Sequence, residues 1–193
     1  MPAFTAKVIV TCFLIYLALF GAVSSGIVLR EPDICFLLAM GRWICEHQMQ
    51  LPAVDPFSYT YIQFPPGSTY AVYQWLTEVL FYGLVRTLGL PALLVCAAVV
   101  MTLSFVVVPL RILALKGCNN ITSLLMVALL VLTSCTHLSV RPEIFSYLFT
   151  AAFLELFARF NRRTKAGIDW IFVASAAAIT CIWSNMHCLY VLS

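Results

Sequence analysis

Long apolar runs alternate with short polar segments along this chain. A helix needs about 20 apolar residues to cross the roughly 30 Å hydrocarbon layer of a membrane. Five runs approach that length, at about 8–29, 90–115, 121–138, 142–160 and 170–191. The first is longer than the apolar core of a signal peptide, which favours an uncleaved helix. The pattern therefore predicts a single membrane domain, residues 1–193, with five transmembrane helices, the second of them broken at Pro109.

The segment between the first two runs, residues 31–89, is polar and aromatic. It holds five of the eight carboxylates, namely Glu31, Asp33, Glu46, Asp55 and Glu78. Apolar residues spaced three and four apart predict helices over 33–49 and 73–88. Asp33 is placed to cap the first helix, and Glu78 is expected on the solvated face of the second. Amphipathic helices that carry Trp and Tyr are typical of the membrane interface.

The composition excludes a soluble globular domain, because 63% of the residues are hydrophobic and only 10% are charged. The net charge of +3 is too small to indicate nucleic-acid binding. None of the eight cysteines forms a CxxC pair, and most lie in apolar runs, so no metal or disulfide site is indicated.

Positive charge predicts the orientation of the helices in the membrane. With five spans, three groups of basic residues fall on one side, which is then cytoplasmic. The segment 31–89 then faces the periplasm or the cell exterior. The three groups are Lys7; Arg111 and Lys116; and Arg159, Arg162, Arg163 and Lys165.

Asp33, Asp55 and Arg141 are the first candidate site residues. Asp33 is a general base or metal-binding carboxylate, or else only a helix cap. Asp55 is a second acid, or forms a turn before a proline. Arg141 has the forked donors that bind a lipid phosphate, or else it pairs with Glu143 or Glu31.

The other candidates end the later apolar runs on the same predicted side of the membrane. Glu143 follows Arg141 closely, and an ionisable pair beside a bilayer is costly unless it is paired or functional. Asn185 and His187 end the fifth run, where a lone histidine is more often a hydrogen-bonded interface residue than a ligand. All six candidates map to one membrane face, and this convergence strengthens the functional interpretation of each residue.

Several motifs follow one another along nearly the whole chain: PD and GRWI, then VDPFSYT, WLTE, RPEIFS and WSNMH. In this order they resemble the GT-C superfamily, membrane glycosyltransferases that use a polyprenyl-phosphate sugar donor. The resemblance implies an all-α GT-C-like N-terminal module in a bacterial inner (plasma) membrane. It implies Asp33 as the base that deprotonates or orients an acceptor hydroxyl. It also implies that a basic residue, here Arg141 or His187 and often with a divalent metal ion, stabilises the departing phosphate.

Two positions depart from the motifs, because Leu37 and Gln74 stand where ionisable residues are expected. The five runs also fall short of the seven or more spans of such enzymes. Two functions therefore remain open. The chain is a glycosyltransferase, or the N-terminal part of one, whose partners are a lipid-linked sugar donor and membrane lipids. Alternatively, it is an inactive relative that serves as a scaffold for other membrane subunits.

Overall fold

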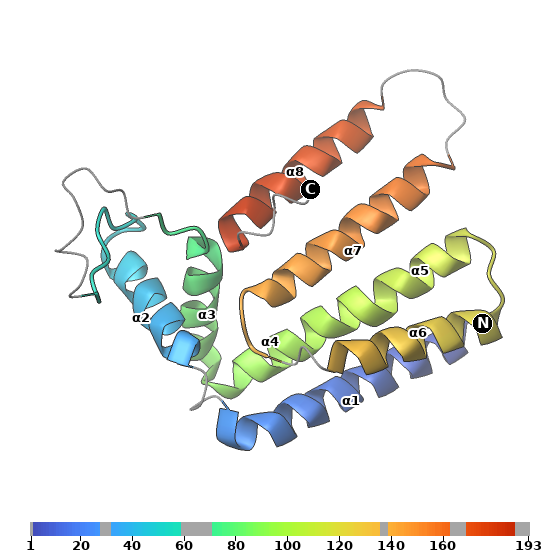
Figure 1. Ribbon diagram of the computed structural model, residues 1–193, viewed down its shortest axis with the longest axis horizontal. Helices are drawn as coiled ribbons and strands as arrows, with labels where there is room; N and C mark the ends of the chain where they lie inside the picture. The colour runs from blue at the N-terminus through green and yellow to red at the C-terminus, as the bar shows by residue number, and fades with distance from the viewer. Residues whose placement is uncertain (1, 28–31, 59–70, 136–138, 163–168, 188–193) are drawn as a thin grey trace.

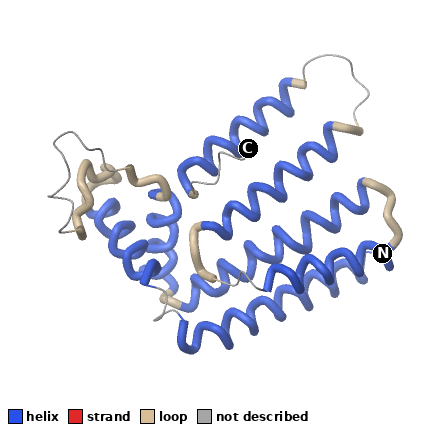
Figure 2. Tube along the Cα trace, in the orientation of Figure 1, coloured by secondary structure: helices blue, strands red, loops and turns tan. Residues whose placement is uncertain are grey.

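The computed structural model describes residues 2–27, 32–58, 71–135, 139–162 and 169–187. All regular structure within these ranges is helical, which confirms the all-α prediction for this part of the chain (Figure 2). The elements are α1 (Pro2–Ile27), α2 (Pro32–Glu46), α3 (Trp75–Leu88), α4 (Pro91–Thr102), the π-helical segment η2 (Leu103–Val107), α5 (Val108–Leu115), α6 (Asn120–Ser134), α7 (Glu143–Phe160) and α8 (Trp170–Met186).

The helices form two groups (Figure 1). The long apolar helices α1, α4 to α5, α6, α7 and α8 run side by side, and α2 and α3 form a hairpin at one end of them. The core joins the two groups, since Ile34 and Phe81 of the hairpin are buried with Met101 and Ile144 of the long helices. Each of the five predicted spans thus corresponds to helical structure.

One continuous helical segment runs from Pro91 to Leu115, so the expected break at Pro109 does not occur. A proline removes one helical hydrogen bond, and its ring crowds the carbonyl four residues earlier, here that of Phe105. The chain accommodates this with the π-helical turn η2, in which the Val108 N–H donates to the Leu103 carbonyl. The wider turn lets the helix continue past the proline.

Local signals in the sequence account for several helix ends. Asn119 caps α6 by accepting a hydrogen bond from the Thr122 backbone N–H at 2.8 Å. Asp169 caps α8 through the N–H groups of its first turn. Gly89 ends α3 with a φ of 82°, a conformation that favours glycine. Side-chain oxygens and glycine are the usual ways to end a helix without orphaned backbone groups.

A shared ion pair ties α5 to α7 at the end of the long helices far from the hairpin. Glu155 is 8% exposed, and its Oε1 atom lies 2.9 Å from Arg111 Nη2 and also accepts from Arg159. Two of the three predicted basic groups therefore meet at one end of the molecule. Arg163 and Lys165 lie outside the described residues.

The segment Pro91–Leu115 is the one helix in the described ranges that is long and apolar enough to cross a membrane, with a mean hydropathy of 2.7. Thr5–Leu19, Asn120–Ser134 and Trp170–Met186 are apolar but shorter. The ends of the predicted first, third and fifth spans, at 28–29, 136–138 and 188–191, lie outside the described residues.

The hairpin is held by a close approach of α2 and α3 at Gly41. A Cβ atom added to Gly41 would lie 2.1 Å from the carbonyl oxygen of Glu78 and 2.9 Å from Cβ of Tyr82. This crossing buries the face of α3 that carries Thr77, Glu78 and Phe81. The prediction that Glu78 lies on a solvated face was therefore wrong: its side chain is 2% exposed.

Candidate functional site

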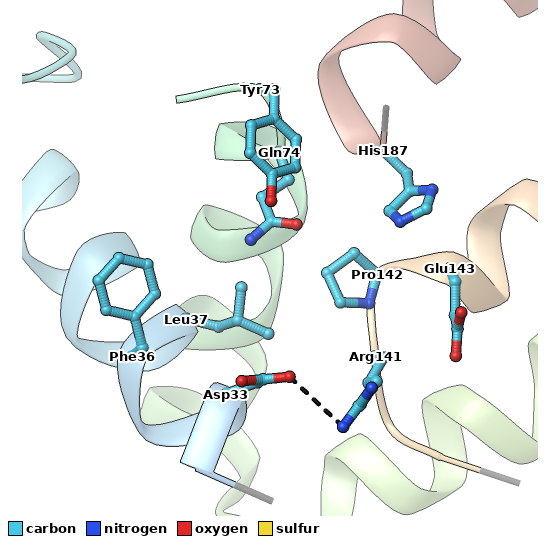
Figure 3. Close-up of a pocket in the computed structure, with 9 residues that line it drawn as sticks. All are labelled: Asp33, Phe36, Leu37, Tyr73, Gln74, Arg141, Pro142, Glu143 and His187. Atoms are coloured by element: carbon cyan, nitrogen blue, oxygen red, sulfur yellow. Dashed lines mark ion pairs between the residues drawn. The ribbon is translucent and has the colours of Figure 1, made fainter. Parts of the chain in front are cut away.

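A pocket of about 330 Å³ opens where the α2–α3 hairpin meets the start of α7 and the end of α8 (Figure 3). Four of the six candidate residues line it, although they lie far apart in the sequence. They are Asp33, Arg141, Glu143 and His187. Phe36, Leu37, Tyr73, Gln74 and Pro142 complete the lining. The size lies at the lower end of the range for small-molecule sites, about 300–1,000 Å³.

Asp33 and Arg141 face each other across this pocket (Figure 3). Arg141 Nη2 lies 3.5 Å from Asp33 Oδ2, and the two side chains are 42% and 57% exposed. Helix α2 begins at Pro32, so Asp33 lies within its first turn rather than at the predicted cap. Of the two partners expected for Arg141, Glu31 lies outside the described residues. An exposed ion pair of this kind contributes about 0–1 kcal/mol, so a ligand can displace it.

Glu143 lies in the first turn of α7, directly after the Arg141-Pro142 bend that brings both side chains to the pocket. Its Oε1 atom accepts a hydrogen bond from the Ser139 hydroxyl at 3.2 Å. A carboxylate at a helix N-terminus is favoured by the partial positive charge there. Glu143 is thus held in place by local structure while it lines the pocket.

His187 ends α8 and closes the opposite wall of the pocket. Its backbone N–H donates to the Trp183 carbonyl, and its Nδ1 atom lies 2.9 Å from the hydroxyl oxygen of Ser146. The Trp183 indole N–H donates to that same oxygen at 2.9 Å. The sequence analysis included Ser146 and Trp183 in the RPEIFS and WSNMH motifs but gave neither a role, because spacing alone does not reveal contacts between α7 and α8.

Asn185 points to a different partner and is not part of the lining. Its Oδ1 atom accepts a hydrogen bond from the indole N–H of Trp75 at 2.7 Å. Nearby, the Thr77 hydroxyl donates to the Met186 carbonyl at 2.8 Å. Both bonds fasten α3 to the end of α8, so Asn185 helps to set the shape of the pocket from outside it.

Asp55 also lies outside the pocket lining. Its Oδ1 atom accepts a hydrogen bond from the backbone N–H of Phe57 at 2.9 Å. This is the turn geometry expected for an aspartate before a proline, the alternative weighed from the sequence. Residues 59 and 60, which complete the VDPFSYT motif, lie outside the described residues.

The two residues that depart from the motif pattern both lie at the pocket. Leu37 is 1% exposed in the core between the hairpin and the long helices. Gln74 hydrogen-bonds to Glu78. Burial raises the pKa of the Glu78 carboxyl from 4.5 to about 7, although the hydrogen bond from Gln74 lowers this pKa. In the described part of the chain, Glu78 Oε2 has no hydrogen-bond partner.

The side chains of the pocket can bind an anion and accept a proton. Arg141 supplies forked cationic donors, Asp33 and Glu143 supply carboxylates, and His187 supplies an imidazole. Among the described residues, no group of three or more His, Cys, Asp or Glu side chains is arranged to hold a metal ion. The described side chains of the pocket therefore do not form a metal site by themselves.

Comparisons with protein-family models, with curated proteins and with solved structures give no match to this chain.

Proposed function

We propose that this chain is an integral membrane protein that crosses the bilayer five times, with α2 and α3 at the extracytoplasmic interface. Each predicted span corresponds to helical structure, and among the described residues Pro91–Leu115 is the helix that is long and apolar enough to cross a membrane. Arg111 and Arg159 gather at one end of the long helices, as positive charge does on a cytoplasmic face.

Apolar side chains exposed on the outside of the bundle also support the membrane assignment. On α6, residues at helical spacing present such a face: Ile121 is 74% exposed, Leu125 61%, Leu129 63% and Leu132 68%. A contiguous apolar surface of this kind is unusual on a soluble monomer. Lipid chains would cover it without cost.

For the activity, we propose transfer of a sugar from a polyprenyl-phosphate donor to a lipid or surface acceptor, as the GT-C resemblance implies. The observation that carries this proposal is the convergence of Asp33, Arg141, Glu143 and His187 on one pocket, at the end of the bundle opposite Arg111 and Arg159. A donor with its chain in the bilayer would present its phosphate at this level.

The proposed reaction uses Asp33 and Arg141 in separate roles. Asp33 accepts the proton of the acceptor hydroxyl as the acceptor oxygen bonds to the anomeric carbon. The bond from that carbon to the phosphate oxygen breaks, and its electron pair leaves with the polyprenyl phosphate. Arg141 leaves its exposed ion pair with Asp33 and binds the phosphate instead. There its guanidinium stabilises the negative charge that develops on the departing phosphate.

A non-catalytic scaffold in a membrane complex is the second candidate. Leu37 and Gln74 favour it, because both have structural contacts at the positions where ionisable residues were expected. In this alternative the acids of the pocket act only in ion pairs and turns, and the exposed apolar faces bind other membrane subunits.

The Asp33→Asn variant distinguishes the two. We expect it to lower sugar transfer from a labelled polyprenyl-phosphate sugar in membranes by about a hundredfold, because general base catalysis contributes at least that much. Glu46→Gln is the matched control, since Glu46 is an exposed carboxylate on the same helix, paired with Arg42 at 2.8 Å. Equal transfer by wild type and Asp33→Asn at equal expression would exclude Asp33 as the base.

A further inference from the structure

The Trp183 indole fixes the role of the Ser146 hydroxyl oxygen. An indole N–H can only donate a hydrogen bond, and here it reaches Ser146 Oγ at 2.9 Å. Its ring is held among Phe149 and Phe153, with centroid separations of 5.8 and 6.2 Å, and Trp183 is 2% exposed. Ser146 Oγ therefore accepts in this contact, and the direction of the bond is settled.

The proton of the Ser146 hydroxyl has one destination within the described part of the chain. Ser146 is 3% exposed, so water does not accept it. Some other buried hydroxyls donate to a carbonyl of their own helical segment, as Ser104 does to Val100 at 2.7 Å. Ser146 makes no such bond, and in the described part of the chain its remaining hydrogen-bond contact is His187 Nδ1 at 2.9 Å.

A serine proton donated to Nδ1 determines the tautomer of the imidazole. A neutral imidazole has one nitrogen with a proton and one without. If Nδ1 accepts from Ser146, the proton of the neutral ring is on Nε2. The backbone N–H of His187 is also bound, to the Trp183 carbonyl, which restricts the position of the residue.

We propose that Trp183 and Ser146 hold His187 as the neutral Nε2–H tautomer, so that it serves this pocket as a hydrogen-bond donor to an oxyanion beside Arg141. Ser146 is a positioning residue in this arrangement. A neutral N–H donor next to a guanidinium can bind a phosphoryl oxygen. Because the imidazole carries no charge, it does not form an ion pair with Asp33 or Glu143 instead. The identity of the oxyanion, a polyprenyl phosphate, rests on the proposed function, whereas the tautomer does not.

Nitrogen NMR of protein labelled with ¹⁵N-histidine in detergent micelles tests the tautomer directly, at a pH where the ring is neutral. The chain has three histidines, so the His187 signals are identified as those lost in His187→Gln. We expect Nε2 to give the signal of a protonated nitrogen and Nδ1 that of an unprotonated one. A protonated Nδ1 of His187 in the wild-type protein would overturn the proposal.

Variants test whether Ser146 is responsible. Ser146→Ala should give a mixture of both tautomers, and Ser146→Thr, which keeps the hydroxyl, should restore the wild-type signals. Ser104→Ala is the matched control, because it removes a buried hydroxyl that bonds only within its own helix. A wild-type tautomer in Ser146→Ala would contradict the role of Ser146. Because no substrate is present, a failure of the Asp33→Asn prediction leaves this result unaffected.

Discussion

Replacing Gly41 with alanine is expected to destabilise the protein by about 3 kcal/mol or more, since overpacking at a rigid contact costs about 1–3 kcal/mol and more where nothing can yield. The added Cβ would lie 2.1 Å from the Glu78 carbonyl oxygen and 2.5 Å from its carbonyl carbon. Both are backbone atoms inside α3, so no side-chain rotation relieves the contact. The hairpin must separate, which also strains its attachment to α8 through Thr77.

Gly83→Ala is the matched control for this substitution. Gly83 lies within α3, and a Cβ atom added there meets nothing within 4 Å. The same chemical change should therefore stabilise the protein by about 0.5–1 kcal/mol, because alanine is the better helix former. Denaturant titration in detergent micelles measures both variants. Equal stabilities for Gly41→Ala and Gly83→Ala would show that α2 and α3 do not meet closely at Gly41.

Replacing Glu78 with glutamine is expected to remove a pH dependence of stability. Burial raises the Glu78 pKa from 4.5 in the unfolded chain to about 7, so the folded protein favours the protonated form. The contribution of this group to stability is therefore full below pH 4.5 and is lost as the pH rises through about 7. A difference between 4.5 and about 7 amounts to about 3 kcal/mol at 1.36 kcal/mol per pKa unit.

Above the folded pKa, the glutamine variant should accordingly be more stable than wild type by about 3 kcal/mol. At pH 4 the two proteins should be nearly equal. Glu46→Gln removes an exposed carboxylate from α2 and should keep the wild-type pH dependence. Unfolding free energies measured at pH 4, 6 and 8 test this. An unchanged difference between wild type and Glu78→Gln across that range would contradict the raised pKa of a buried Glu78 carboxyl.

The apolar runs were enough to predict the long helices, because a helix satisfies the backbone hydrogen bonds of a long apolar segment within the segment itself. The hairpin helices were also predicted, at 33–49 and 73–88 against the observed Pro32–Glu46 and Trp75–Leu88. The continuation past Pro109 was missed, since the π-helical turn that makes it possible has no distinct sequence signal. Whether these helices cross a membrane stays a prediction.

The face of α3 was predicted less well than the helix itself. Periodicity identifies one apolar stripe, whereas α3 packs against α2, α4 and α8 at once. Glu78 is buried where α3 contacts α2, beside Gly41. A glycine is required at position 41 because the backbone of α3 lies directly against it. No local pattern in the sequence reports a partner 37 residues away, the separation of Gly41 and Glu78.

The number of predicted spans was enough to place four candidates on one side of the bundle, because every second connection between antiparallel helices lies on the same side. These candidates are Asp33, Arg141, Glu143 and His187. Their meeting in one pocket, and the exclusion of Asp55 and Asn185 from its lining, depended on tertiary packing. The contacts of Ser146, a residue of the RPEIFS motif, were not predicted for the same reason, because its partners Trp183 and His187 come from α8 and its C-terminal cap.

Binding of a polyprenyl phosphate is the most direct test of the central claim, that the pocket holds a lipid-linked phosphate. Affinities for polyprenyl phosphate and for the uncharged polyprenol of the same length are compared in detergent micelles. We expect wild type to prefer the phosphate by at least about tenfold, the effect of one charge-assisted contact, and Arg141→Ala to lose that preference. Arg86→Ala, an exposed change on α3, should retain it. Equal binding of phosphate and alcohol by the wild-type protein would contradict the account.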